Sequence, residues 1–254
     1  MNFKKIAIAL LLAGCASHPM AEPIRQDNAP PLIPTQAESS QSTINAQGFD
    51  TWLSAFKTKA LQSGISKRTI NAALSNLKPN GKVVDLDQKQ PEKKLTKEEY
   101  LANVISEQRI EKGRELMQEN KALLDDISKK TGVEPEYIVA LWGLESGYGA
   151  NTGKFSIVSA LATLAYEGRR RDFFESELIS ALLIIDEGHA TMADLKGSWA
   201  GAMGQCQFMP SSYLAYAVST SISSKKVLIG TNGPSVIRRI SSILKTSCPC
   251  PAPW

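Results

Sequence analysis

The sequence has 254 residues, of which 43% are apolar and 21% are charged, and its formal net charge is +4. These proportions are ordinary for a soluble globular protein, and the length fits one sizeable domain or two small ones. A mild positive charge is compatible with an anionic polymer or surface, but no basic run is long enough to act as a nucleic-acid-binding arm. We therefore expect no nucleic acid among the partners.

Residues 1–15 are predicted to be a signal peptide rather than part of the fold. Two lysines precede the apolar run Ile6–Leu12, which is too short to span a membrane as a helix. The tetrapeptide Leu-Ala-Gly-Cys that ends at Cys15 resembles the bacterial lipoprotein box, whose cysteine is lipidated and becomes the new N-terminus. Ala16 follows, and lipoproteins without Asp there usually go to the outer membrane. The prediction is a lipid anchor on Cys15, at the outer membrane facing the periplasm. The alternative is ordinary cleavage beside an incidental cysteine.

Residues 16–44 are predicted to be a flexible tether. They hold five prolines along with Gln, Ser, Glu and Asn, and they have few large apolar groups. This composition cannot bury enough surface to fold. A tether after a lipid anchor lets a domain search for a target near the membrane.

The rest of the chain is predicted to be mostly α-helical, because apolar residues recur at helical spacing and no alternating strand pattern of useful length occurs. Helices at 49–63 and 66–77, with Ser66 as N-cap, are expected to form an N-terminal helical hairpin. Residues 83–86 are expected to be extended. A capping box of Thr96 and Glu99 begins the next helix. The later helical segments are predicted at 96–110, 114–130, 135–146, 155–166 and 173–187.

The helix that begins at Pro135 carries an ionisable group on its apolar side. Glu145 follows Ile138 by seven residues and Trp142 by three, which places all three on one face. Gly147 then favours a left-handed helix end. Such a position raises the pKa of a carboxyl group by desolvation and leaves a proton donor at neutral pH. The alternative is that Glu145 is a solvated helix-end residue.

A second informative stretch, 198–216, combines glycines with polar and aromatic side chains. Its glycines let backbone approach closely to a ligand. Ser198 and Gln207 can hydrogen-bond sugars or amides, while Trp199, Phe208 and Met209 can cover apolar ring faces. The alternative is a tightly packed structural turn.

Histidine and cysteine usage predicts no metal centre. The two histidines, His18 and His189, are too few and too far apart for metal or triad chemistry. Once Cys15 is set aside, the remaining cysteines are odd in number, which gives no disulfide framework. Cys248 and Cys250 lack the spacing of a zinc site.

Taken together, the motifs resemble the lytic murein transglycosylases of the B type, the glycoside hydrolase family 103 type, which cut the glycan strand of peptidoglycan. The similarity runs from about Phe49 to Val218. The motifs in order are QPE at 90–92, LWGLESGYG around Glu145, LATLAYEGRR before Arg171, FFESEL at 173–178 and GSWAGAMGQCQFMPSSYLAYAV ending at Val218. Several long motifs in one order are far more specific than any single motif.

The resemblance implies a lysozyme-like helical catalytic domain whose single acid/base is Glu145. It also implies a set of residues that bind saccharide or peptide groups along a groove. These are Ser198, Gln207, Phe208, Arg169, Arg170 and, on a looser alignment, Tyr100.

The implied chemistry uses one acid, whereas a glycosidase normally uses two carboxylates. Glu145 would protonate the glycosidic oxygen and then remove the proton from the muramic acid 6-hydroxyl, which closes a 1,6-anhydro ring without water. The nearest candidates for a second carboxylate are Glu175, Glu177 and Asp186. Their helix pattern predicts that Glu177 and Asp186 lie largely on a solvated polar face.

The resemblance ends abruptly after residue 218. Members of the family usually continue with a segment rich in Asp and Gly, which binds calcium in some of them, and that site is not recognisable here. We expect no cofactor. Our hypothesis is that 219–254 is a frameshifted, prematurely ended tail, because the codons of residues 243–246 shifted by one base can spell Tyr-Leu-Lys-Asp. The predicted layout is a signal peptide at 1–15, a tether at 16–44, an incomplete lysozyme-like domain at 45–218 and an aberrant tail at 219–254.

Three functions are compatible with this layout. The first is a lipid-anchored lytic transglycosylase that acts on peptidoglycan glycan strands, impaired if the truncated segment is needed to build the groove. The second is a non-catalytic peptidoglycan-binding lipoprotein. The third is a lipid-anchored helical scaffold in which Glu145 is incidental.

Overall fold

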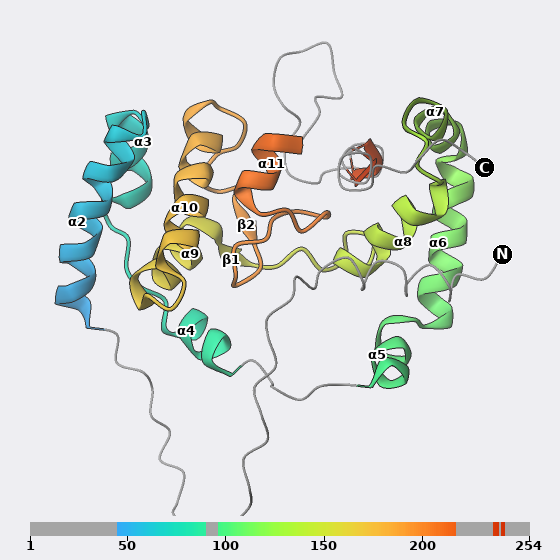
Figure 1. Cartoon of the computed structure of the whole chain (residues 1–254), viewed down its shortest axis with the longest axis horizontal. Helices are drawn as coiled ribbons and strands as arrows, with labels where there is room; N and C mark the ends of the chain where they lie inside the picture. The colour runs from blue at the N-terminus through green and yellow to red at the C-terminus, as the bar shows by residue number, and fades with distance from the viewer. Residues whose placement is uncertain (1–44, 90–95, 217–235, 239, 242–254) are drawn as a thin grey trace, which may run out of the picture.

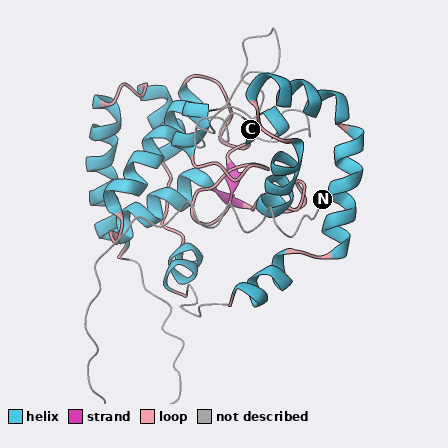
Figure 2. Cartoon of the chain, turned by 45° about the vertical axis from the view of Figure 1, so that its right-hand side comes forward, coloured by secondary structure: helices cyan, strands magenta, loops and turns pink. Residues whose placement is uncertain are grey.

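The computed structural model describes residues 45–89, 96–216, 236–238, 240 and 241. The predictions for the signal peptide, Cys15, the tether, the QPE motif and most of the tail lie outside the described residues. Figure 1 shows the arrangement of the elements and Figure 2 their secondary structure. The elements are α2 Ala46–Gln62, α3 Lys67–Leu74, α4 Gly81–Gln88, α5 Lys97–Val104, α6 Glu107–Glu119, α7 Lys121–Thr131, α8 Pro135–Ser146, β1 Phe155–Ser156, α9 Ile157–Glu167, α10 Arg171–Asp186, β2 Lys196–Gly197 and α11 Pro210–Tyr216.

Helix α9 lies at the centre of the core. Its residues from Ile157 to Ala165 are buried except for Ser159. Helices α10 and α4 pack on α9, and α10 also contacts α11 and α3. We use the name α9 core for the assembly of α2, α3, α4, α9, α10, α11 and the two strands. Burial of large apolar side chains of this kind is the main favourable term in folding.

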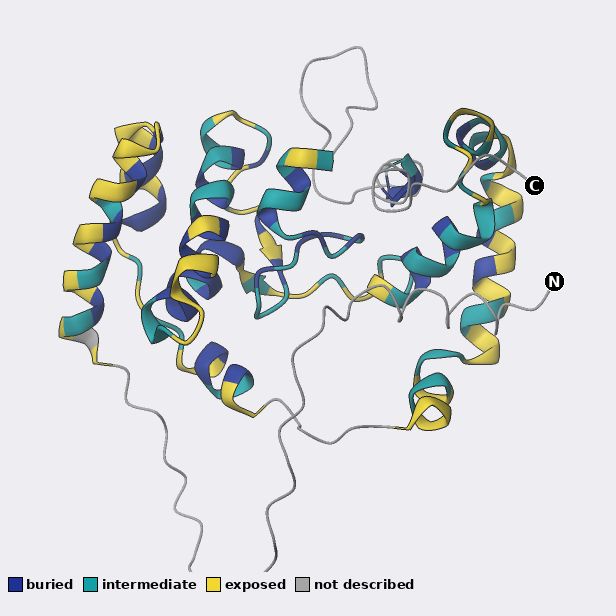
Figure 3. Cartoon of the chain, in the orientation of Figure 1, coloured by how far each residue is buried: buried dark blue, intermediate teal, exposed yellow. Residues whose placement is uncertain are grey.

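A second group of helices carries the candidate acid. Helix α8 packs on α6 and α7, and we call these three helices the α8 bundle. It occupies one end of the molecule in Figure 1, opposite α2 and α3. Figure 3 shows exposed residues along α2 and α6, whereas buried residues lie on α9, α10 and α8. The strands β1 and β2 pair antiparallel, with Phe155 opposite Gly197, at the middle of the molecule.

The mostly helical class and the N-terminal hairpin are confirmed. Helices α2 and α3 pack against each other, and the Ser66 hydroxyl accepts from the Thr69 amide at 3.2 Å. The capping box is also confirmed, since Thr96 N–H donates to Glu99 Oε2 at 2.8 Å and Glu99 N–H donates to Thr96 Oγ1 at 3.2 Å. Among the described residues, no helix is long and apolar enough to cross a membrane.

Two predictions of local structure were wrong. Residues 83–86 are not extended but lie in α4, because Asn80 caps the helix by accepting from Lys82 N–H and because Val83 and Val84 are buried. The continuous helices expected at 96–110 and 114–130 are three shorter ones. The chain is extended at Ile105, and it breaks again at Asn120, whose side chain donates to the carbonyl of Leu116 at 2.9 Å.

Candidate active site

Glu145 lies in the last turn of α8. Proline at the first position starts this helix, and Ile138 and Val139 on its inner face are fully buried. Gly147 ends it in the left-handed conformation, with φ 57° and its N–H donating to the Gly143 carbonyl at 3.0 Å. The predicted helix start and end are both confirmed. The side chain of Glu145 is more exposed than the pattern predicts, because it lies at the edge of the buried face and at the open end of the helix.

The carboxyl group of Glu145 has a pKa raised above its ordinary value by desolvation. The surrounding protein removes part of the hydration of the carboxylate, although solvent still reaches the side chain. Within the described residues, no hydrogen bond or ion pair engages this carboxyl group, and no charge acts on its pKa. An isolated carboxylic acid with a raised pKa, open to solvent on one side, is suited to donate a proton to a ligand.

The three candidate second carboxylates are all engaged elsewhere. Glu175 is 8% exposed and accepts from Trp52 Nε1 at 2.9 Å and from Lys59 Nζ at 2.6 Å. Glu177 is buried, so its predicted place on a solvated polar face was wrong, whereas Asp186 is half-buried and solvent still reaches it.

Glu177 is 4% exposed and accepts from the backbone and hydroxyl of Ser211 at 3.0 and 2.6 Å. Asp186 accepts from the side chains of Ser66 and Thr69, the latter at 2.5 Å. Their partners are distant in sequence, which is why the helix pattern did not reveal them. All three carboxylates hold elements together, and Glu145 is left as the candidate acid.

The glycine-rich loop 198–209 folds into a small antiparallel ladder beside β2. Met203 bridges both Gly197 and Phe208, and the Met203 N–H donates to the Phe208 carbonyl at 2.8 Å. Ser198 closes the first turn, because its Oγ accepts from Ala202 N–H at 3.0 Å. Phe208 is 8% exposed and packs in the core. Contact of Ser198 and Phe208 with saccharide stays a prediction, and both residues have a structural role as well.

Gln207 ties this loop to the segment that follows α8. Its backbone has a φ of 48°, and its side-chain amide donates to the carbonyls of Gly204 at 2.7 Å and Thr152 at 3.2 Å. Both donors of the amide are therefore used by the protein, and the carbonyl Oε1 is the group that remains for a ligand. In the predicted hydrogen bond to a sugar, Oε1 of Gln207 would therefore be the acceptor, and a sugar hydroxyl or amide N–H would be the donor.

A contact that the sequence analysis missed joins the loop directly to α8. Trp142 Nε1 donates to Gln205 Oε1 at 2.7 Å. The Gln205 side chain fills the space over Gly149, where an added Cβ would lie 2.6 Å from it. The one available signal was the tryptophan itself, since a buried indole N–H usually has an acceptor.

The paired arginines lie apart from the end of α8. They follow the C-terminal end of α9, a helix that begins directly after β1. With 11 residues this helix is roughly 16 Å long, so the arginines lie about that far from β1. Arg169 forms an ion pair with Asp87 of α4 at 2.5 Å, and Asp87 is 4% exposed. Arg170 stacks over Phe173 with its guanidinium carbon 4.3 Å from the ring centroid. Their predicted contact with saccharide or peptide groups stays a prediction, and Arg169 also fastens α4 to the end of α9.

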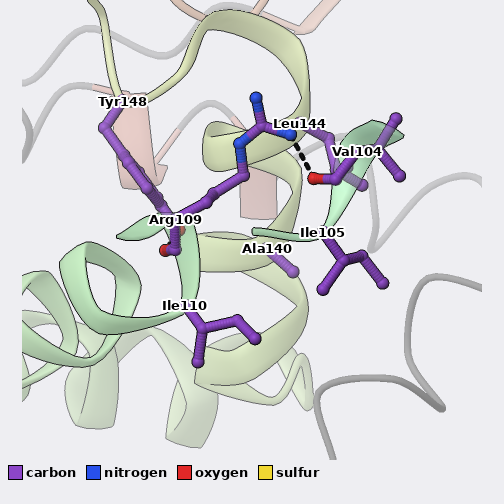
Figure 4. A pocket seen from close by; sticks show the side chains of 7 residues that line it. All are labelled: Val104, Ile105, Arg109, Ile110, Ala140, Leu144 and Tyr148. Carbon is purple, nitrogen blue, oxygen red and sulfur yellow. Dashed lines mark hydrogen bonds between the residues drawn. The ribbon is translucent and has the colours of Figure 1, made fainter. Parts of the chain in front are cut away.

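Tyr100 lies half-buried on α5, a helix with no buried residue. Beside α5 is a small apolar pocket of about 40 Å³. Figure 4 shows its lining, with the Arg109 guanidinium donating to the Val104 carbonyl. The lining residues are Val104, Ile105, Arg109, Ile110, Ala140, Leu144 and Tyr148. Tyr100 does not line this pocket, and its predicted role in the cleft stays a prediction.

A short segment of the predicted tail packs into the domain. Val236, Ile237 and Ile240 are buried, and Cys206 Sγ lies 3.8 Å from the Val236 carbonyl oxygen. The hydrogen bond from Lys130 lowers the pKa of Asp126 on α7, and the nearby charge of Arg238 adds to this effect. In Figure 1 this segment lies between α11 and α7. It therefore contacts the loop of the α9 core, and its Arg238 lies near α7 of the α8 bundle.

No group of three or more His, Cys, Asp and Glu side chains within the described residues is arranged to hold a metal ion. The helical architecture and the lone desolvated acid at the end of a buried helix define a lysozyme-like lytic transglycosylase fold. The chain belongs to the family described as Transglycosylase SLT domain, whose profile matches residues 48–245. The predicted resemblance is thereby confirmed.

Individual relatives agree with this family. The chain is 39% identical over 123 residues to membrane-bound lytic murein transglycosylase B of Escherichia coli (strain K12), covering 48% of this chain and 34% of the relative. It is similar to the crystal structure of SltB3 from Pseudomonas aeruginosa in complex with NAG-NAM-pentapeptide, with a TM-score of 0.74, 34% identity and coverage of 79% of this chain and 53% of that one. For soluble lytic transglycosylase SltB1 of the same species the TM-score is 0.71, with 30% identity and coverage of 77% and 66%.

The chain thus spans about a third of the curated relative and about half of SltB3. The family match continues past residue 218, where the motif similarity was predicted to end. The domain boundary at 218 and the frameshift of the tail stay predictions.

Proposed function

We propose that this chain is a lytic transglycosylase that cleaves the β-1,4 bond between MurNAc and GlcNAc in peptidoglycan and leaves 1,6-anhydroMurNAc ends. The observation that carries the proposal is the isolation of Glu145, an acid with a raised pKa while Glu175, Glu177 and Asp186 are all engaged elsewhere. SltB3 has been crystallised with NAG-NAM-pentapeptide and with NAG-anhNAM-pentapeptide, which supports a muropeptide substrate for a chain of this fold.

In the proposed reaction Glu145 acts first as an acid and then as a base. Its proton passes to the glycosidic oxygen as the bond from that oxygen to C1 of MurNAc breaks. The 6-hydroxyl oxygen of the same MurNAc then bonds to C1, and its proton passes to the Glu145 carboxylate, which restores the acid. The acetamido group of the substrate can stabilise the positive charge that develops at C1. No water and no cofactor enter the balance, in keeping with the single carboxylate.

The glycine-rich loop is the proposed site of sugar recognition. Ser198 and Gln207 lie on this loop, and Gln207 is held on the segment after α8 through Thr152. The Oε1 of Gln207, which accepts no hydrogen bond from the described residues, would accept one from the substrate. Arg169, Arg170 and Tyr100 are proposed as outer contacts, with peptide or saccharide groups of a longer glycan.

We also propose that the protein is a lipoprotein anchored through Cys15 at the outer membrane and facing the periplasm. The supporting observation is the Leu-Ala-Gly-Cys tetrapeptide after a short apolar run. The similarity to a membrane-bound relative supports a place in the cell envelope. Radiolabelled palmitate incorporation in wild type and Cys15→Ala tests the anchor, and equal labelling of the two would rule it out.

The reaction is tested by digesting purified sacculi and analysing the released muropeptides by mass spectrometry. Anhydro ends are lighter by one water than hydrolysed ends, so the proposal predicts anhydro products from wild type and none from Glu145→Gln. Products with reducing ends alone would reject the mechanism. A wild type that pulls down with sacculi but releases nothing would instead identify the non-catalytic binding protein, and failure to bind would leave the scaffold.

A further inference from the structure

The hydrogen bond between Trp142 and Gln205 connects α8 to the glycine-rich loop, two parts of the molecule that lie far apart in the sequence. Trp142 belongs to the α8 bundle and precedes Glu145 by three residues, on the same side of the helix. Gln205 belongs to the loop of the α9 core. The bond from the indole N–H to Gln205 Oε1 is 2.7 Å long, and Trp142 is 4% exposed. A bond of this kind inside protein is strong and directional.

We infer that Gln205 is a positioning residue for Glu145, which acts through the Trp142 indole by holding the glycine-rich loop against the end of α8. The inference rests on the proposed role of Glu145 as the acid.

Further contacts fix the same junction. Tyr148 packs edge-on against Trp142, with ring centroids 5.7 Å apart, and its hydroxyl donates to the Arg109 carbonyl at 2.9 Å. Tyr148 holds a left-handed backbone with a φ of 59°, which is unusual for a residue with a side chain. The backbone at Gly149 leaves no room for a side chain because Gln205 occupies it. Gln205 thus accepts a hydrogen bond from the tryptophan before Glu145 and packs over the backbone of the glycine after it.

The two attachments of the loop lie on either side of the acid in the chain. Gln205 bonds to Trp142 before Glu145, and Gln207 bonds to the Thr152 carbonyl after it. A loop fastened at both points fixes how closely the sugar-binding groups and the acid approach. Loss of the Trp142 bond frees one of the two attachments of the loop and admits water to the end of α8.

The test compares variants that remove an indole hydrogen bond at two places. Trp142→Phe removes the bond to Gln205, and Gln205→Leu removes the acceptor while keeping bulk beside Gly149. Trp52→Phe is the matched control, because Trp52 Nε1 donates to Glu175 Oε1 at 2.9 Å on a different helix pair. Gln62→Ala controls for loss of an exposed glutamine.

The first readout is the release of anhydromuropeptides from saturating sacculi. Gln205→Leu and Trp142→Phe are each expected to lower the rate roughly 10- to 100-fold, as expected for misplacement of a reacting group by about an ångström. The double variant is expected to be no slower than the slower single variant, because each single change already removes the bond between Trp142 and Gln205. The control variants are expected to keep the wild-type rate. Additive losses, or losses equal to those of Trp52→Phe, would overturn the inference.

The second readout does not need activity. Carbon-13 NMR of labelled glutamate carboxyls, with Glu145→Gln to assign the signal, gives the pKa of Glu145 directly. Gln205→Leu is expected to move this pKa down toward its ordinary value, because desolvation is the cause of the present shift. A merely structural role in stability would leave it unchanged in the folded protein, and an unchanged pKa would refute the inference.

The two readouts separate the inference from the proposed function. If wild type and Glu145→Gln release equal amounts of product, the proposed function fails. The titration of Glu145 in Gln205→Leu still tests whether Gln205 positions Glu145. If Glu145→Gln abolishes release but Gln205→Leu leaves both the rate and the pKa of Glu145 unchanged, the proposed function stands and the positioning role of Gln205 is rejected.

Discussion

The buried carboxylate of Glu177 is predicted to hold α11 on α10, and replacing it with alanine tests this. Glu177 lies on α10 and accepts from both the backbone N–H and the hydroxyl of Ser211, at 3.0 and 2.6 Å. Ser211 is the second residue of α11, so its N–H is one of the donors that a helix start leaves without an internal partner. The variant Glu177→Ala removes both acceptors at once.

The expected loss follows from these two bonds. Hydrogen bonds to a charged group contribute about 1.5–3 kcal/mol each, so two give roughly 3–6 kcal/mol. Part of this is offset because the variant no longer desolvates a carboxylate. A net loss of about 3 kcal/mol corresponds to a fall in Tm of roughly 6–12 °C for a domain of this size.

Thermal unfolding followed by circular dichroism measures the effect. Glu177→Gln keeps the shape and one acceptor, and it is expected to lose about half as much. Asp172→Ala is the control, because Asp172 is an exposed acid at the start of the same helix. It is expected to cost under about 1 kcal/mol. A Tm of Glu177→Ala within 2 °C of the control would show that the carboxylate does not hold α11, and the reasoning would be wrong.

Three further predictions concern other groups. Because desolvation raises the pKa of Glu145, its ionisation in the folded state costs stability as pH rises through that pKa, so Glu145→Gln is expected to melt higher than wild type at pH 8 and equally at pH 4. Burial raises the pKa of Glu175, but the bonds from Lys59 and Trp52 outweigh it and the net pKa is lowered. Glu175→Gln should therefore lose about 1 kcal/mol at pH 7 and less at pH 3, because a carboxyl group with a lowered pKa loses its contribution as the pH falls through that pKa, and urea titrations at the two pH values measure this. Ile237→Asp places a charge at a fully buried position and should cost more than about 3 kcal/mol by the same titration, and a smaller cost would mean that the segment is not part of the core.

Features set by neighbouring residues could be predicted from the sequence, and features set by distant partners could not. The capping box of Thr96 and the glycine end of α8 are local, and both are confirmed. The raised pKa of Glu145 was predicted from helical spacing and the glycines that follow, with a solvated residue as the alternative, and the side chain is more exposed than that spacing predicts. Helix α4 was missed because paired valines favour strands, whereas here they are buried in a helix that packs on α9, about eighty residues away in the chain.

The same limit explains the errors at the site. Glu177 was predicted to be solvated because its helix neighbours are polar, but its partner Ser211 is 34 residues away. Gln205 carried no signal of its own, since its acceptor role depends on a tryptophan 63 residues earlier. A polar residue on an amphipathic helix can therefore be either solvated or bonded to a residue far away in the sequence. The sequence of its own helix does not distinguish these two environments.

The division of the molecule has a consequence for how stability and activity are related. The acid lies on the α8 bundle, while Ser198 and Gln207 lie on the loop of the α9 core. Their relative position depends on contacts between the two parts, among them the Trp142 bond to Gln205, and the segment from Val236 lies near both parts. Such contacts are few compared with those inside α9 and its neighbours, so they are expected to open at a lower free energy than the core unfolds. Substitutions at this junction should therefore reduce the reaction rate well before they unfold the protein, whereas substitutions inside α9 should reduce both together.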